Sequence, residues 1–126
     1  MSKSALLDSW AWIEIFRDTP AGRMLQERYE TSEKIISAIN LHEVYTKFLV
    51  EDLALAVFAR NSMLAAAKVF LVSAELALRA AELRKKYPRF SMADSIIAAT
   101  AEENNAILVT GDEDFKGVTE IKVHLI

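Results

Sequence analysis

Residues 106–115 read Ala106-Ile107-Leu108-Val109-Thr110-Gly111-Asp112-Glu113-Asp114-Phe115, a short apolar run that ends in an acidic turn. The run has the length and the flanking turn residues of a buried strand. Three further acids, Asp8, Glu43 and Asp94, also stand where an apolar run meets the next helix or turn. In an α/β fold such junctions converge at one edge of the sheet, so we expect these carboxylates and Asp112 to lie together.

The rest of the chain alternates between strand and helix patterns. Strand patterns cover residues 4–7, 34–39, 69–72, 106–109 and 121–125. Helical patterns follow Asp8, span 21–29, start at Asn40, cover 51–61, run from Ser73 to near Pro88, and start again at Ser91. Asn40 and Ser91 are the expected N-caps of their helices. Strands that alternate with helices predict a parallel sheet with helices on both faces.

Composition limits the class of protein. The chain has 126 residues, 52% of them hydrophobic, which predicts one domain over residues 1–126. It contains no cysteine, which excludes disulfides, thiolate metal sites and cysteine nucleophiles. The three glycines, at positions 22, 111 and 117, are too few for a dinucleotide fingerprint or a P-loop. We see no signal peptide and no uncharged stretch of about 20 residues, so we expect no membrane segment and a cytoplasmic protein.

The charge of the chain limits the class of protein less than its composition does. A net charge of −3 argues against a nonspecific nucleic-acid binder but does not exclude a nuclease. Basic residues gather around Pro88: Arg79, Arg84, Lys85, Lys86 and Arg89. A solvated helix end is the simpler interpretation of this run, and a local basic patch is the alternative.

Each acid, taken alone, has a structural interpretation. Asp8 is placed to cap the helix that follows it. Glu43 stands three residues after Asn40, the spacing of a capping box, and one turn before Lys47. The Asp residues at 112 and 114 suit a turn.

Asp94 differs from the other acids. It has capping-box spacing from Ser91, but it also begins the apolar stripe of its helix, so we expect it to point toward the sheet edge. A carboxylate aimed inward needs a partner. Four such placements at one edge favour a shared site over four independent caps, and their mutual repulsion would require hard divalent cations with oxygen ligands.

Four segments match a known pattern in order and spacing: Leu6-Leu7-Asp8-Ser9-Trp10-Ala11-Trp12-Ile13-Glu14, Asn40-Leu41-His42-Glu43-Val44, Ala93-Asp94-Ser95-Ile96-Ile97-Ala98-Ala99-Thr100-Ala101 and Leu108-Val109-Thr110-Gly111-Asp112-Glu113-Asp114-Phe115. Together they resemble PIN-domain proteins of the VapC toxin type, over nearly the whole chain. The resemblance implies a three-layer α/β/α sandwich around a central parallel sheet. It also implies an endoribonuclease that hydrolyses RNA phosphodiester bonds with Mg²⁺ or Mn²⁺.

The resemblance implies a set of site residues as well. These are Asp8, Glu43, Asp94 and Asp112 as catalytic metal ligands, Asp114 as an accessory ligand, and Ser9 and Thr110 as supporting hydroxyls. Trp10 departs from the pattern, because a small polar residue is common at this position. That departure affects the expected shape of the pocket floor.

For the toxin type, the resemblance implies three partners: an RNA substrate, a second copy of the chain in a homodimer, and a VapB-type antitoxin whose tail blocks the pocket. Two other functions stay open, a PIN-fold RNA-processing nuclease without an antitoxin and a noncatalytic PIN-like binding module. Retention of all four acids argues against the binding module. A receiver-type phosphorelay domain is disfavoured because no acidic pair stands beside Asp8.

Overall fold

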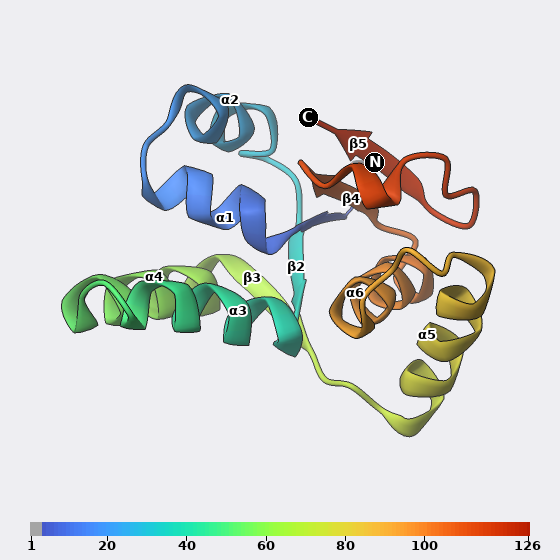
Figure 1. The fold of residues 1–126 in the computed structure, drawn as a ribbon. Helices are drawn as coiled ribbons and strands as arrows, with labels where there is room; N and C mark the ends of the chain where they lie inside the picture. Colours follow the sequence, from blue (N-terminus) through green and yellow to red (C-terminus); the bar gives the residue numbers. More distant parts are fainter. Residues whose placement is uncertain (1–3) are drawn as a thin grey trace.

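A computed structural model describes residues 4–126. Within this range, five parallel strands form one sheet in the order β3-β2-β1-β4-β5 (Figure 1). The strands are β1 (Ala5–Leu7), β2 (Lys34–Ser37), β3 (Ala67–Phe70), β4 (Ile107–Thr110) and β5 (Lys122–Leu125). The predicted parallel sheet is confirmed.

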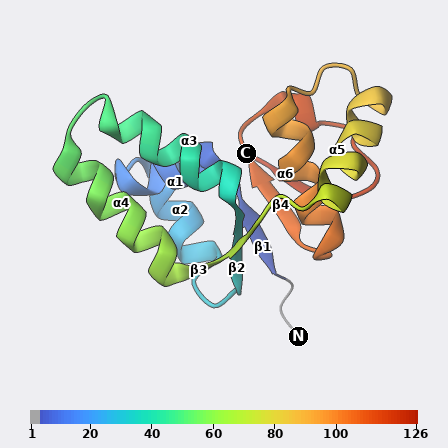
Figure 2. The ribbon, with the colours of Figure 1, turned by 90° about the horizontal axis from the view of Figure 1, so that it is seen from below.

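Helices cover both faces of this sheet (Figure 2). Those of the described chain are α1 (Ser9–Phe16), α2 (Pro20–Arg28), α3 (Ala38–Leu49), α4 (Leu53–Ala66), α5 (Ala74–Lys86) and α6 (Met92–Glu103), with a 3-10 turn η1 (Glu113–Phe115). In Figure 2, α1–α4 lie to the left of the sheet and α5 and α6 to its right. Across residues 4–126, none of the helices is sufficiently long and apolar for a membrane crossing.

Alternate strand residues supply two separate hydrophobic cores. Leu6 and Leu108 pack into the core formed with α5 and α6, where both are fully buried. Their neighbours Leu7 and Val109 pack into the core formed with α1–α4. Because successive side chains of a strand point to opposite faces, apolar runs of this kind can face helices on both sides. The three-layer α/β/α architecture is therefore confirmed.

The strand order places a switch point beside β1. The chain passes from β1 to β2 and β3 on one side, and later adds β4 and β5 on the other side. The carboxyl ends of β1 and β4 flank this switch point, which is where open α/β sheets bind ligands. Asp8 directly follows β1, and Asp112 comes two residues after β4.

The predicted start of the third helix is wrong. The sequence pattern favoured a strand over 34–39 and an N-cap at Asn40, whereas α3 begins at Ala38 and Ser37 is the N-cap. Asn40 is the third helical residue, and its side-chain oxygen accepts a hydrogen bond from the Ser37 backbone N–H at 2.9 Å. The apolar Ile39 continues the apolar run of β2 across the junction, so hydrophobicity alone does not show where the strand ends.

The next two boundaries also differ from the prediction. The helix expected over 51–61 begins later, after the N-cap Asp52, and continues to Ala66. The following strand is Ala67–Phe70 instead of 69–72. Ala65 and Ala66 favour the longer helix because alanine has the highest helix propensity.

Candidate metal-dependent active site

Asp8 forms the floor of the site. It is the N-cap of α1 and only 8% exposed. Its Oδ1 accepts a hydrogen bond from the Ser9 backbone N–H, and its Oδ2 accepts one from the Thr110 hydroxyl, each at 2.5 Å. Since these donors come from α1 and β4, the Asp8 carboxylate is fixed across the switch point.

Burial raises the pKa of Asp8 to about 6. The hydrogen bonds from Thr110 and Ser9 oppose that rise, and the nearby charges of Glu43 and Asp94 add to it. Glu43 of α3 and Asp94 of α6 are therefore near enough to Asp8, the N-cap of α1, for their charges to act on it. A buried carboxylate with acidic neighbours is unfavourable unless a cation compensates the charge.

Glu43 reaches the floor from the second turn of α3. Its Oε1 accepts a hydrogen bond from the Ser9 hydroxyl at 2.6 Å, and the buried Asn40 side chain donates to the same hydroxyl at 3.1 Å. Glu43 is half-buried and does not enter the hydrophobic core. Within residues 4–126 its side chain is held by Ser9, and neither the capping box with Asn40 nor an ion pair with Lys47 forms.

Asp94 stands in the first turn of α6. The predicted capping box is present: the Ser91 N–H donates to Asp94 Oδ2 at 3.1 Å, and the Asp94 N–H donates to Ser91 Oγ at 3.0 Å. Burial raises the pKa of Asp94, and the charges of Asp112 and Asp114 raise it further. The cap and the inward placement therefore occur together in one residue.

Asp112 is the N-cap of η1, two residues after β4, and Asp114 lies within η1. Asp112 Oδ1 accepts a hydrogen bond from the Asp114 N–H at 2.9 Å. The Asp112 N–H donates to Thr110 Oγ1 at 3.0 Å, so the Thr110 hydroxyl links this turn to Asp8. The fully buried Phe115 anchors the turn in the core with α5 and α6.

Two further contacts hold the acidic turn in place. The exposed Arg89 donates to the backbone carbonyls of Asp114 at 2.6 Å and Lys116 at 2.5 Å. The ring of Trp10 lies against Gly111, where an added Cβ would come within 2.8 Å of ring atoms Cδ2 and Cε2. Trp10 therefore requires glycine at this position, and its ring ties the first turn of α1 to the turn that carries Asp112.

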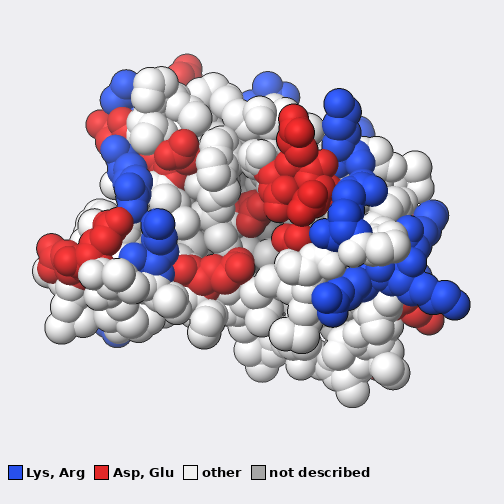
Figure 3. All heavy atoms as spheres, viewed as in Figure 1, with Lys and Arg blue, Asp and Glu red and all other residues white. Residues whose placement is uncertain are grey.

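Three acids, which we call the rim acids, are close enough to share an ion. Asp94, Asp112 and Asp114 each offer a carboxylate oxygen within 4.8 Å of the others. Over the described part of the chain, no Lys or Arg forms an ion pair with any of the five site acids. Figure 3 shows acidic side chains gathered at a hollow between the α1–α4 half and the α5–α6 half. A donor set made only of carboxylate oxygens fits a hard divalent cation.

The basic residues around Pro88 are largely engaged elsewhere. Arg79 pairs with Glu102 at 2.7 Å, and Lys86 pairs with Glu120 at 2.7 Å. Arg84 donates to the Phe90 carbonyl at 3.1 Å. These contacts agree with the simpler interpretation of a solvated helix end, although Figure 3 also shows blue side chains beside the acidic hollow.

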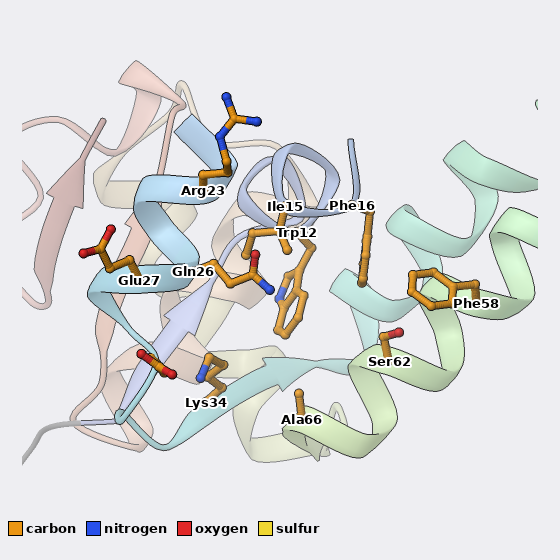
Figure 4. Close-up of a pocket in the computed structure, with 11 residues that line it drawn as sticks. Trp12, Ile15, Phe16, Arg23, Gln26, Glu27, Lys34, Phe58, Ser62 and Ala66 are labelled. Atoms are coloured by element: carbon orange, nitrogen blue, oxygen red, sulfur yellow. The ribbon is translucent and has the colours of Figure 1, made fainter. Parts of the chain in front are cut away.

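A groove lies away from the acids, among residues 12–66. It has a volume of about 700 Å³ and runs between α1, α2 and α4. Figure 4 shows Trp12, Phe16 and Phe58 along its apolar part, with Arg23 and Glu27 at its edge. None of the five candidate site acids lines this groove.

Sequence reasoning missed three residues that build the site: Asn40, Gly111 and Arg89. The sequence predicts Asn40 as an N-cap, although Asn40 also stands one helical turn before Glu43. In the sequence, Gly111 is only one residue of a turn. The Trp10 ring that excludes a larger side chain at this position is evident only from the structure. No sequence signal links Arg89 to carbonyls 25 and 27 residues away.

Comparison with known proteins identifies the class. The sequence model described as "PIN domain" matches residues 5–121. The chain belongs to the PIN domain family. No curated protein sequence matches it.

Solved structures agree with this fold. A toxin-antitoxin complex from Klebsiella pneumoniae is 25% identical, with a TM-score of 0.83 over 97% of this chain and 99% of that chain. VapBC2 from Rickettsia felis, bound to a DNA fragment from the promoter, is 18% identical, with a TM-score of 0.81 over 98% of each chain. VapC20 of Mycobacterium tuberculosis, described as a Sarcin-Ricin loop cleaving toxin, is 20% identical, with a TM-score of 0.72 over 93% of this chain and 98% of that chain.

Proposed function

We propose that this protein is a metal-dependent endoribonuclease and the toxin of a type II toxin–antitoxin pair. The observation that carries the proposal is the group of five carboxylates at the sheet edge, which no Lys or Arg of residues 4–126 neutralises. Membership of the PIN domain family supports nuclease activity. The similar toxin–antitoxin complexes support the role as a toxin.

Asp8, Glu43, Asp94 and Asp112 are the catalytic metal ligands in this proposal, and Asp114 is an accessory ligand. When bound there, Mg²⁺ or Mn²⁺ supplies Lewis-acid stabilisation of the phosphate charge and lowers the pKa of water. Thr110 and Ser9 hold the floor carboxylates in fixed directions. Rim acids with free oxygens face the hollow through which the RNA phosphate enters.

The partners follow from the same comparisons. Several of the similar structures are complexes of a toxin with its antitoxin, so we propose a VapB-type antitoxin for this chain. A homodimer, a single domain over residues 1–126 and a cytoplasmic location stay predictions. Co-expression with the product of a small neighbouring open reading frame, followed by purification of a complex, separates the toxin from an RNA-processing nuclease that acts alone.

The proposal is tested by cleavage of labelled RNA with Mn²⁺, Mg²⁺ or EDTA. We expect cutting with metal, none with EDTA, and a loss of more than about a hundredfold in Asp94→Asn, because several kcal/mol of charge stabilisation depend on the ligands. The matched control is Asp52→Asn, which removes a carboxylate charge at the N-cap of α4, outside the site. Full activity of a folded Asp94→Asn variant would contradict the assignment of Asp94. Failure of the wild type to cut any RNA in a broad panel would instead favour a noncatalytic binding module.

A further inference from the structure

We propose that Asn40 is a positioning residue that acts through Ser9 to orient the Glu43 carboxylate. The inference rests on the proposed function, because it concerns the same acidic site. Asn40 is fully buried, and its side-chain oxygen and nitrogen are both hydrogen-bonded. A buried polar side chain with both ends satisfied is held in one orientation.

The first step fixes the Asn40 amide. Its Oδ1 accepts the Ser37 backbone N–H at 2.9 Å, and a backbone N–H can only donate. The other end of the amide is therefore the NH₂ group, and it donates to Ser9 Oγ at 3.1 Å. The end of β2 thus determines which end of the amide faces the site.

The second step fixes the Ser9 hydroxyl. A hydroxyl has one proton to donate, and its oxygen here already accepts from Asn40. The proton of Ser9 consequently points to Glu43 Oε1, at 2.6 Å. This bond holds one Glu43 oxygen and restricts the orientation of the carboxylate.

The alternative is that Asn40 only caps the start of α3. A cap acts on stability, whereas a positioning residue also acts on metal affinity, where loss of a partner that orients a ligand costs about tenfold or more. Ser37→Ala is the matched control, because it removes the N-cap hydroxyl of the same helix and leaves both side-chain hydrogen bonds of Asn40 in place. The two roles therefore predict different outcomes for Asn40→Ala and Ser37→Ala.

The experiment measures Mn²⁺ affinity by calorimetry and stability by thermal unfolding, in wild type, Asn40→Ala, Ser9→Ala, the double variant and Ser37→Ala. We expect Mn²⁺ binding about tenfold weaker in Asn40→Ala and Ser9→Ala, no further loss in the double variant, and unchanged affinity in Ser37→Ala. Asn40→Ser replaces Asn40→Ala if the latter does not fold, because one short hydroxyl does not span both Ser37 and Ser9. Unchanged Mn²⁺ affinity in the folded Asn40 variant, or fully additive losses, would overturn the inference. Absence of Mn²⁺ binding by the wild type would instead overturn the proposed function.

Discussion

The floor of the site is buried and tied to several elements, whereas its rim is half-buried and held by local bonds. At the floor, Asp8 accepts from α1 and β4, and Ser9 links α1 to two residues of α3. At the rim, Asp94 and Asp112 use one oxygen each to cap their own turns. Both regions carry the same kind of charge in different surroundings.

The difference shows how a single fold can keep acids together and still leave ligand atoms available. The floor resembles a preorganised framework, in which hydrogen bonds set the direction of each carboxylate before any ion arrives. The rim keeps oxygens that no side chain of the described residues binds. We therefore expect floor substitutions to change the stability of the metal-free protein as well as metal binding, and rim substitutions to change mainly metal binding.

The largest expected effect is at the rim. Asp112→Asn should reduce cleavage by more than about a hundredfold, because it removes an anionic ligand and keeps the shape of the turn. Stability without metal should change by less than about 1 kcal/mol, since the amide oxygen can still accept from the Asp114 N–H. Parallel cleavage assays and urea unfolding measure both quantities. Cleavage within tenfold of the wild type would exclude Asp112 as a ligand.

The next effect is at the floor and depends on pH. Because the pKa of Asp8 is about 6 in the folded chain and 3.8 in the reference state, the folded protein binds more protons between these values. The protonated Asp8 carboxyl therefore contributes stability that is fully present below about pH 4. This contribution is lost as the pH rises through 6 and the buried carboxyl becomes charged. Asp8→Asn should therefore stabilise the metal-free protein by about 2 kcal/mol at pH 7.5 and by little at pH 4. The cost of losing one hydrogen bond is already subtracted from the value at pH 7.5.

Urea unfolding of both proteins from pH 4 to pH 8, with EDTA, tests this prediction. Mg²⁺ should reverse the order of stability at pH 7.5, because only the wild type keeps the full ligand set. A stability difference that does not vary with pH would show that burial of the Asp8 charge has no cost.

A smaller effect is expected at the contact between floor and rim. Gly111→Ala should destabilise the protein by about 1–2 kcal/mol, because the added Cβ displaces the Trp10 ring. In a Trp10→Ala background, Gly111→Ala should cost much less, because the ring atoms that the Cβ would meet are gone. A double-mutant cycle by thermal unfolding measures the coupling, and simple additivity would mean that Trp10 and Gly111 do not constrain each other.

The smallest effect concerns the outer support of the rim. Arg89→Gln removes the guanidinium that binds the carbonyls of Asp114 and Lys116. Mn²⁺ affinity should fall a few-fold, less than for Asp112→Asn, since the buried Phe115 still anchors the turn. Calorimetry with Mn²⁺ provides the measurement, and Lys85→Gln serves as a charge-matched surface control. An equal loss in both variants would indicate a long-range charge effect instead of local support.

The sequence predicts the parallel sheet and the acidic edge because both depend on local patterns. Strand–acid junctions and the Ser91–Asp94 spacing are visible within a few residues. The start of α3 was mispredicted because Ile39 extends the apolar run, and this error concealed the role of Asn40. The Trp10–Gly111 and Arg89 contacts join residues far apart in sequence, so no local pattern indicates them.

An anomalous difference map from crystals of the wild-type protein grown with Mn²⁺ would show directly whether the acidic edge of the sheet binds a metal ion. We expect a peak at the sheet edge, roughly 2–2.5 Å from carboxylate oxygens of Asp94 and Asp112, and no such peak in Asp112→Asn crystals. A peak at another location, or none at this edge in a protein that cleaves RNA with Mn²⁺, would show that these carboxylates do not hold the catalytic metal.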